Sequence, residues 1–230
     1  MTESLFPSRW PPKHPDRIQL YSLATPNGKK IAIALEELQL PYEAHRIDIL
    51  AGDQHDPGFL KLNPNGKIPA LIDPDGPGGE PLVLMESGAI LLYLADKTGK
   101  LVPADPRLRW EVTQWLMFQM ASVGPYFGQF GHFFKYARDK TSDDYALERY
   151  TKEAKRLLGV LDRRLAGRDY LVGGELSIAD IATFPWVGGL EHYEARDALE
   201  VASFGNVGAW YDRCTSRPAA QRGAKVCGFD

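Results

Sequence analysis

The stretch P-L-V-L-M-E-S-G-A-I-L-L-Y-L-A-D-K, Pro81 to Lys97, joins a short apolar run to an apolar helix pattern. Its first six residues are typical of a strand. Ser87 then stands where a side-chain hydroxyl can cap a helix, and the helix is expected to end near Thr98 and Gly99 because glycine favours helix ends. The stretch therefore predicts a strand that leads directly into a capped helix.

A second apolar run, Ile68 to Asp73, lies just before this stretch, and the turn formers P-D-G-P-G-G-E separate the two. Such a pair predicts a β-hairpin. Further upstream, Ile18 to Ser22 predicts a strand, Gly28 to Gln39 a helix with one apolar face, and Glu43 to Ile49 another strand. The predicted order is β-α-β followed by β-β-α.

Beyond Lys100 the pattern becomes entirely helical. Helices are predicted over Leu108 to Phe130, Asp143 to Ala166, Ser177 to Tyr193, and Ser203 to Ser216. The third begins with S-I-A-D, in which Ser177 and Asp180 have the spacing of a capping box. We therefore predict a proline-rich extended arm over residues 1–16, an α/β domain over 17–99 and an all-helical domain over 106–230.

Composition excludes several classes of function. The 230 residues carry a net charge of −3, with no dense lysine and arginine cluster that would bind nucleic acid or an anionic membrane. Cys214 and Cys227 form neither a disulfide framework nor a zinc site, so we expect no metal and a reducing cytoplasm.

The segment Val112 to Phe134 lacks charged residues but is too polar to span a membrane, so we expect it to be buried or to face a partner.

The first candidate binding motif is T-P-N-G, Thr25 to Gly28, at the corner between the first strand and the first helix. Unpaired N–H groups and the helix dipole favour negative charge at such a corner. A thiolate held there by the Thr25 hydroxyl or the Asn27 amide would have a lowered pKa. The corner contains no cysteine, so the sulfur would have to belong to a ligand. The alternative interpretation is a simple turn and helix cap.

The second motif is K-I-P-A-L, Lys67 to Leu71. A proline at the start of a strand usually marks a turn or an edge strand, and the peptide bond before it is usually trans. If the bond is cis instead, the backbone N–H and C=O of Ile68 turn outward, where an extended peptide can pair with them as an added strand. The motif therefore leaves both interpretations open.

The third motif is M-E-S-G-A-I, Met85 to Ile90. Ser87 and the N–H groups after it can bind a carboxylate at a helix N-terminus, and Glu86 can bind an ammonium group. The alternative is an ordinary serine cap. Taken together, the three motifs predict a site for a small peptide that carries its own thiol.

These motifs, with G-P-Y-F-G-Q-F-G-H-F, A-x-E-R-Y and S-I-A-D-I-A, resemble the glutathione transferase family, in particular its bacterial nu class and the fungal relatives of the yeast nitrogen-regulating prion protein. The resemblance extends from about Ile18 to about Pro218. It implies a thioredoxin-like N-terminal domain, an all-α C-terminal domain, glutathione as a co-substrate, no metal and a homodimer. Val112 to Phe134 is then a candidate dimer interface.

The resemblance also implies roles for individual residues. Thr25 and Asn27 would lie at the glutathione sulfur, with the main contact left open between them. The remaining glutathione contacts would be Gln54 and Lys67 at the glycyl end, Ile68 and Pro69 at the cysteinyl backbone, Glu86 and Ser87 at the γ-glutamyl end, and Arg149 from the helical domain. Phe127, Phe130 and His132 would line a second-substrate pocket. Arg149 as a solvated charge and the phenylalanines as core residues are the alternatives.

The expected activity is attack of a glutathione thiolate on a disulfide, with transferase and peroxidase side activities and no protein thiol involved. Two other interpretations stay open. The chain could be a non-catalytic binding or regulatory module with the same fold, because fold alone does not settle activity. It could also be an unrelated thioredoxin-fold protein with an appended helical bundle.

Overall fold

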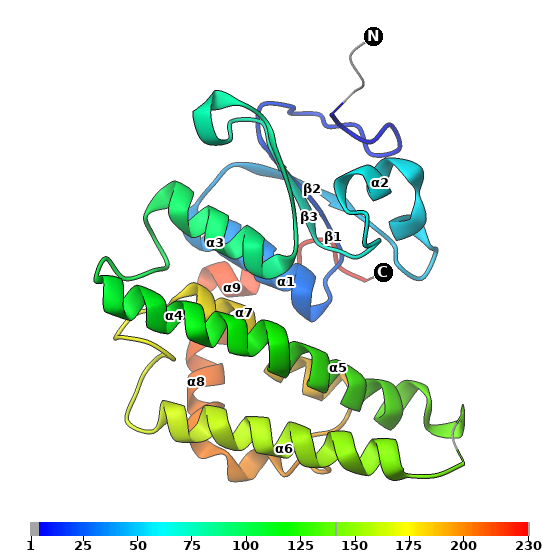
Figure 1. Ribbon diagram of the computed structural model, residues 1–230, viewed down its shortest axis with the longest axis vertical. Helices are drawn as coiled ribbons and strands as arrows, with labels where there is room; N and C mark the ends of the chain where they lie inside the picture. Colours follow the sequence, from blue (N-terminus) through cyan, green and yellow to red (C-terminus); the bar gives the residue numbers. More distant parts are fainter. Residues whose placement is uncertain (1–4, 141, 230) are drawn as a thin grey trace. The chain divides into compact units, whose positions relative to one another are not determined.

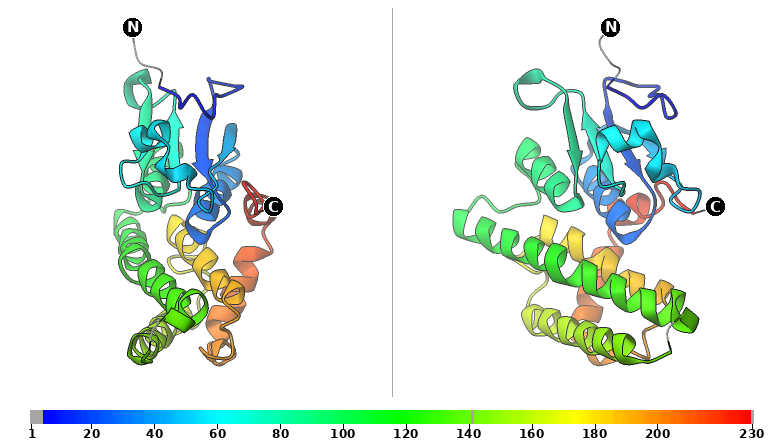
Figure 2. Two further views of the ribbon diagram at one scale, coloured as in Figure 1. Left: turned by 90° about the vertical axis from the view of Figure 1, so that its right-hand side faces the viewer. Right: turned by 45° about the vertical axis from the view of Figure 1, so that its right-hand side comes forward.

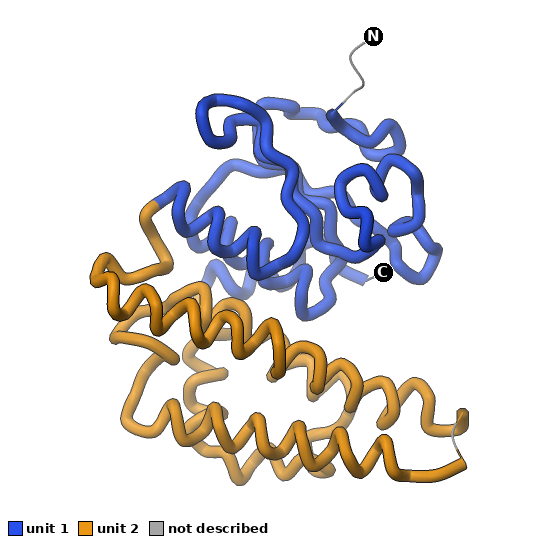
Figure 3. Tube along the Cα trace, viewed as in Figure 1, with its two compact units in different colours: residues 1–98, 218–230 blue, residues 99–217 orange. Residues whose placement is uncertain are grey.

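The computed structural model describes residues 5–140 and 142–229. They form two compact units, shown in blue and orange in Figure 3. Unit 1 contains the described residues up to Thr98 together with those from Pro218 onward, and unit 2 contains those of Gly99–Arg217.

Unit 1 is built on a four-stranded sheet in the order β2-β1-β3-β4. The strands are β1 (Ile18–Ser22), β2 (Tyr42–Arg46), β3 (Ala70–Asp73) and β4 (Leu82–Met85). β1 and β2 pair in parallel because a helix connects them, whereas β3 pairs antiparallel with β1 and with β4. The predicted order of elements along the chain, β-α-β followed by β-β-α, and the predicted hairpin are confirmed.

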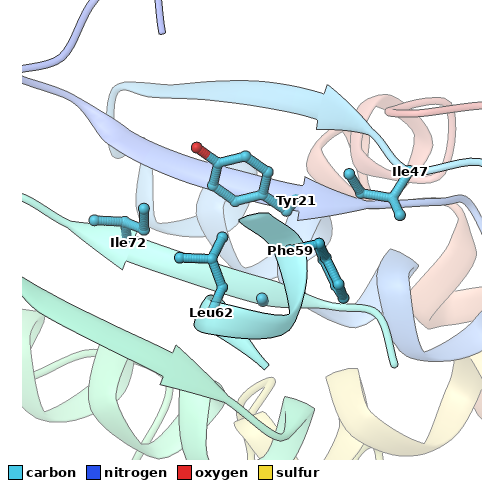
Figure 4. Close-up of a cluster of buried hydrophobic side chains, with 6 residues drawn as sticks. Tyr21, Ile47, Phe59, Leu62 and Ile72 are labelled. Carbon is cyan, nitrogen blue, oxygen red and sulfur yellow. The ribbon is translucent and has the colours of Figure 1, made fainter. Parts of the chain in front are cut away.

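Helices cover both faces of this sheet (Figure 1). The short α2 (Pro57–Leu62) covers one face, and its residues Phe59 and Leu62 pack with Tyr21 and neighbouring strand residues in the cluster of Figure 4. On the other face, α1 (Pro26–Leu38) packs beside α3 (Ser87–Thr98). Strand residues alternate between the two faces, so the sheet carries a core on each side.

The C-terminal residues belong to unit 1. Helix α9 (Pro218–Gly223) packs against α1, beside which it is seen in Figure 2. This approach is close, because a Cβ atom on Gly223 would overlap the backbone of Ile33. Beyond α9, the carbonyl of Cys227 accepts a hydrogen bond from the N–H of Ala24, 2.8 Å away. Residues 106–230 were expected to form one helical domain, whereas the compact unit 2 ends at Arg217.

The N-terminal arm also packs on unit 1 in its described part. Leu5, Phe6 and Trp10 lie against the Figure 4 cluster. The backbone N–H groups of Lys13 and His14 donate to the carboxylate of Glu43 at 2.8 to 2.9 Å. Apolar contacts and hydrogen bonds therefore fix the arm to the unit.

Unit 2 is helical, as predicted. Helix α4 (Pro106–Phe118) continues through a π-helical segment, Gln119–Val123, into α5 (Gly124–Gly131) and a second π-helical segment, His132–Tyr136. In the first π-helical segment the N–H of Gly124 bonds to the carbonyl of Gln119, five residues back, just before Pro125. The other elements are α6 (Tyr145–Leu165), α7 (Ile178–His192) and α8 (Gly205–Thr215), and 3-10 turns occur at Asp53–His55, Pro77–Gly79, Arg138–Lys140 and Val201–Ser203.

The predicted capping box is present at the start of α7. The carboxylate of Asp180 is fully buried and accepts hydrogen bonds from the N–H and hydroxyl of Ser177, the N–H of Leu171 and the indole of Trp210, at 2.8 to 3.0 Å. Burial raises the pKa of Asp180, while these hydrogen bonds oppose the shift. The box therefore joins α7 to a loop and to α8. Over residues 5–140 and 142–229, none of the helices has the length and apolar character needed to cross a membrane.

Candidate functional site

The sheet register brings the three sequence motifs to one end of the sheet. Tyr21 of β1 pairs with Ala70 of β3, and Ala70 pairs with Met85 of β4. The T-P-N-G corner follows β1, the Ile68–Pro69 bond precedes β3, and Glu86 follows β4. All three motifs therefore leave neighbouring strands at the same edge. β2 runs parallel to β1, so the loop that leads to Gln54 also begins at this edge.

Thr25 is the N-cap of α1, with Pro26 and Asn27 as its first two helical residues. The Thr25 hydroxyl oxygen accepts a hydrogen bond from the N–H of Gly28 at 3.3 Å. Since the oxygen is the acceptor in this bond, the hydroxyl hydrogen can be donated to an anion at the helix start. Thr25, Pro26 and Asn27 are half-buried, so a ligand can reach this corner.

Gly28 is required by packing at this corner. A Cβ atom there would overlap the carbonyl oxygen of Leu23 and the hydroxyl of Ser22. Because α1 turns back so closely on the end of β1, the motif can form only with glycine at this position. The T-P-N-G sequence is therefore both a cap and a close approach between a strand and a helix.

The chain's own thiols are poor nucleophiles. Cys214 is fully buried in unit 2. Cys227 lies in unit 1 and is partly buried, and burial raises its pKa to about 11. A thiol with a raised pKa holds little thiolate at neutral pH. Neither cysteine therefore has the properties of an activated protein thiol.

The Ile68–Pro69 peptide bond is cis. Pro69 is buried, and Ile68 is half-buried against the Figure 4 cluster. The preceding turn is held by Asn63, whose side-chain amide donates to the carbonyl of Lys67 at 2.6 Å. This bond fixes the backbone before Ile68, while the Lys67 side chain is exposed.

Gln54 lies in the 3-10 turn Asp53–His55. This 3-10 turn lies beside the turn that precedes Ile68, because Gly66 of that turn faces the carbonyl oxygen of Gln54. Its side-chain amide donates to the carbonyl of Ile49 at 3.3 Å. The side-chain oxygen of Gln54 is buried without a hydrogen-bond partner among the residues that the structure describes. The turn itself is held by Asp53, whose carboxylate binds the Arg9 guanidinium at 2.5 Å.

Ser87 and Glu86 lie at the start of α3. Ser87 is buried, whereas Glu86 is exposed and has a left-handed backbone with φ of 68°. The carbonyl of Glu86 accepts the N–H of Ile90 at 2.9 Å, so Glu86 occupies the cap position of the helix. An exposed carboxylate next to a buried hydroxyl at a helix N-terminus can bind both charges of an amino-acid end.

The sequence prediction missed Lys30 at this site. Its ammonium lies 3.2 Å from the hydroxyl oxygen of Ser87, and the side chain has no exposed surface. Burial lowers the pKa of Lys30 to about 7, and the negative charge of Glu86 partly opposes this shift. The sequence did contain one signal that Lys30 is buried. Lys30 lies three residues before the apolar Ile33 and four before the apolar Ala34, which places it on the same helix face.

Unit 2 contains the other predicted site residues. Arg149 is exposed on α6 and lines a cavity of about 430 Å³. Tyr126, Tyr145, Glu148, Lys152, Glu153 and Arg156 also line this cavity. Phe127 and Phe130 are fully buried, which agrees with the alternative that they are core residues. His132 is exposed with its ring against Phe133, and its place in a second-substrate pocket stays a prediction.

In the described part of the chain, no group of three or more histidine, cysteine, aspartate or glutamate side chains is placed to hold a metal ion. The polar groups of unit 1 at the sheet edge are instead hydroxyl, amide, carboxylate and ammonium groups. Such groups suit an organic ligand that carries charges at its ends.

An α/β unit with this strand order, followed by a helical unit, defines a class of two-part proteins with a thioredoxin-like first unit. Residues 24–97 match the family model of the glutathione S-transferase N-terminal domain, and residues 115–218 match that of the C-terminal domain. The chain belongs to the glutathione transferase family of enzymes.

Two Escherichia coli proteins are similar to the chain. It is 45% identical over 203 residues to the disulfide-bond oxidoreductase YfcG, covering 88% of this chain and 92% of YfcG. It is 45% identical over 224 residues to the disulfide-bond oxidoreductase YghU, covering 93% of this chain and 75% of YghU.

Solved structures agree with this family. A glutathione transferase family member from Pseudomonas fluorescens, solved with two glutathione bound, has a TM-score of 0.95 and 51% identity, covering 97% of this chain and all of that one. A glutathione transferase from Pseudomonas putida, solved with one glutathione disulfide per subunit, has a TM-score of 0.93 and 52% identity, with 95% of each chain covered.

Proposed function

We propose that the chain is a glutathione-dependent disulfide-bond oxidoreductase that holds the glutathione sulfur at the start of α1. The observation that carries this proposal is the register Tyr21–Ala70–Met85, which brings the three peptide-binding motifs to one sheet edge. The names of the two Escherichia coli relatives and the glutathione in the Pseudomonas structures support the same activity.

The proposed contacts follow the order of groups in glutathione. The sulfur is held by Thr25 and Asn27, and the cysteinyl backbone pairs with Ile68 beside Pro69. Gln54 and Lys67 bind the glycyl carboxylate, and Ser87 with Glu86 binds the γ-glutamyl end. A carboxylate suits Ser87 and the α3 N-terminus, while the ammonium of the same end suits Glu86. By the resemblance, Arg149 is proposed as a further glutathione contact, while the exposed His132 is proposed to line the second-substrate pocket together with the segment that contains Phe127 and Phe130.

The chemistry needs no thiol from the protein. A glutathione thiolate attacks one sulfur of the substrate disulfide, forming a mixed disulfide and releasing one substrate thiolate, which takes up a proton. A second glutathione thiolate then attacks the glutathione sulfur of the mixed disulfide and releases the other substrate thiol. Two glutathiones are oxidised to glutathione disulfide while one substrate disulfide is reduced to two thiols. The protein contributes by lowering the pKa of the bound thiol.

Further parts of the proposal concern side activity, location and assembly. We propose transferase and peroxidase side activities, because the same thiolate can attack an electrophilic carbon or a peroxide. We also propose a cytoplasmic location, where the thiols of Cys214 and Cys227 stay reduced. A homodimer is proposed through the α4 to α5 region, where Trp110 and Met117 are exposed seven residues apart on α4, on one helix face.

The test of this function is the turnover of bis(2-hydroxyethyl) disulfide, coupled through glutathione reductase to NADPH oxidation. We expect turnover that depends on glutathione, together with glutathione binding by calorimetry. Binding without turnover of disulfides, electrophiles or peroxides would favour the non-catalytic module. Absence of both glutathione binding and turnover would contradict the proposed function.

A further inference from the structure

The feature that extends the proposed site is the buried lysine of α1. Lys30 has no exposed surface, although lysine is rarely buried completely. Its ammonium donates to the hydroxyl oxygen of Ser87, which is itself buried at the first position of α3. This bond joins α1 to α3, the two helices whose N-termini lie at the proposed sulfur and γ-glutamyl ends of the site.

The direction of this hydrogen bond has a chemical consequence. A lysine ammonium carries three donors and no acceptor, so the Ser87 oxygen must be the acceptor. The hydroxyl hydrogen of Ser87 is then directed to another acceptor. An uncharged lysine amine carries a lone pair and can accept that hydrogen, which would reverse the bond. The charge of Lys30 therefore decides whether Ser87 presents a donor to a ligand.

We propose that Lys30 is a positioning residue for the γ-glutamyl carboxylate of glutathione, which sets the Ser87 hydroxyl as a hydrogen-bond donor and adds a positive charge behind it. This inference rests on the proposed function, since it assumes that glutathione binds with its γ-glutamyl end at Ser87. It adds to the site a residue that does not itself touch the ligand.

The electrostatic surroundings support this assignment. The negative charge of Glu86 acts on the Lys30 ammonium, and burial outweighs it, leaving the pKa of Lys30 at about 7. Other titratable groups lie on the elements packed against α1. Arg222 of α9 pairs with Glu36 and Lys97 of α3 pairs with Asp73, while Asp96 of α3 is exposed and Tyr21 of β1 stacks on His45.

The main test measures how the affinity for S-methylglutathione depends on pH. This probe has no thiol, so ionisation of sulfur does not contribute. At about pH 6 we expect Lys30→Met to raise the dissociation constant by about tenfold, because the cation is lost. At about pH 9 the wild-type lysine is neutral, so the ratio of the two dissociation constants should fall to about two or less. A ratio that stays constant with pH would overturn the inference and indicate a packing role.

A matched control is available in the neighbouring lysine. Lys29 is half-buried on the same helix, and burial lowers its pKa as well. Lys29→Met should change the dissociation constant by less than about twofold at either pH. An equal, pH-dependent effect of both substitutions would overturn the assignment to Lys30.

A double-variant cycle tests the path through Ser87. If Lys30 acts through that hydroxyl, Lys30→Met should have a clearly smaller effect when Ser87→Ala is already present, because only the charge of Lys30 then still acts on the carboxylate. Full additivity would contradict the proposal. Ser87→Ala with Lys30 intact should also abolish most of the affinity loss between pH 7 and pH 9, so the idea can be tested even if Lys30→Met does not fold.

A last comparison separates this inference from the proposed function. The analogue 4-aminobutyryl-cysteinyl-glycine keeps the ammonium of glutathione and lacks its γ-glutamyl carboxylate. Wild type should prefer glutathione over this analogue, and Lys30→Met should lose most of that preference. Normal disulfide turnover with an unchanged preference in the variant would overturn the role of Lys30 alone. Failure of wild type to bind glutathione would overturn both proposals.

Discussion

Helices α1 and α7 both begin at a hydroxyl residue, but their N-termini are satisfied in different ways. At α7, Ser177 and the carboxylate of Asp180 form a capping box in which every named partner is buried. At α1, the Thr25 hydroxyl accepts one long hydrogen bond and the first three residues of the corner remain half-exposed. One helix start is closed by the chain's own groups, whereas the other leaves room for an anion from outside.

This difference indicates how the same local physics supports stability in one unit and binding in the other. A buried carboxylate with several fixed donors holds a loop and two helices together. An accessible helix N-terminus keeps its preference for negative charge available to a ligand. Substitutions at α7 should therefore affect folding, and substitutions at α1 should affect chemistry.

The largest expected effect is the loss of stability in Asp180→Ala. The substitution leaves the N–H groups of Leu171 and Ser177 and the indole of Trp210 buried without their acceptor. We expect the free energy of unfolding to fall by about 3 to 5 kcal/mol. Urea unfolding measures this change. The control is Asp169→Ala, which removes an exposed ion pair with Arg213 and should cost less than about 1 kcal/mol. Equal effects of the two substitutions would contradict the closed-cap account.

The second effect is on catalysis at α1. The pair Thr25→Ala and Asn27→Ala should lower disulfide turnover by well over about tenfold, because the bound thiolate loses its donors. Stability should fall by only about 1 kcal/mol, the usual cost of a lost cap. Comparison of the single variants by steady-state kinetics shows which residue is the main sulfur contact. Cys214→Ser and Cys227→Ser serve as controls and should retain turnover, and loss of turnover in either would indicate a protein-thiol route.

A third effect concerns the pH dependence of stability, which arises from Lys30. Its pKa in the folded protein is about 7, below the ordinary lysine value of 10.5. Between these values the unfolded chain binds the extra proton, so stability should rise with pH. From pH 7 to pH 9, wild type should gain up to about 2 kcal/mol relative to Lys30→Met. Urea unfolding of both proteins across this range measures it. A pH-independent difference would show that Lys30 does not titrate in this window.

The smallest effect is expected at the N-terminal arm. Arg9 binds Asp53 at 2.5 Å, and Asp53 also accepts the N–H of Asp48 at 2.9 Å, so the arm supports the turn that carries Gln54. Arg9→Ala should raise the KM for glutathione by about two- to fivefold without lowering kcat. Arg17→Ala, immediately after the arm, is the control. An unchanged KM in Arg9→Ala would show that the arm does not influence the glycyl end.

Most of the fold was predictable because its signals are local. The strand and helix periodicities, the hairpin turn and the S-I-A-D box each depend on a few neighbouring residues. The placement of residues 218–229 was not predictable in this way. Whether a short helix such as α9 packs in the α/β unit or in the helical unit depends on close contact with Ile33, which no local pattern records.

The candidate site was likewise predictable only in part. The motif residues Thr25, Ile68 and Glu86 were recognisable singly, and the strand register then brought them to one edge. Lys30 was missed because a lysine near a helix start usually faces solvent. Phe127 and Phe130 were expected to line a pocket, but both are fully buried. An aromatic-rich run does not by itself distinguish core residues from the wall of a pocket.

The central claim is that the open start of α1 lowers the pKa of the glutathione thiol. The most direct measurement is a pH titration of bound glutathione, followed by the ultraviolet absorbance of its thiolate, in wild type and in the Thr25→Ala, Asn27→Ala double variant. In wild type the bound thiol should titrate more than about one unit below the ordinary value near 8.5, and in the variant it should return toward that value. A bound thiol with an ordinary pKa in wild type would contradict the account.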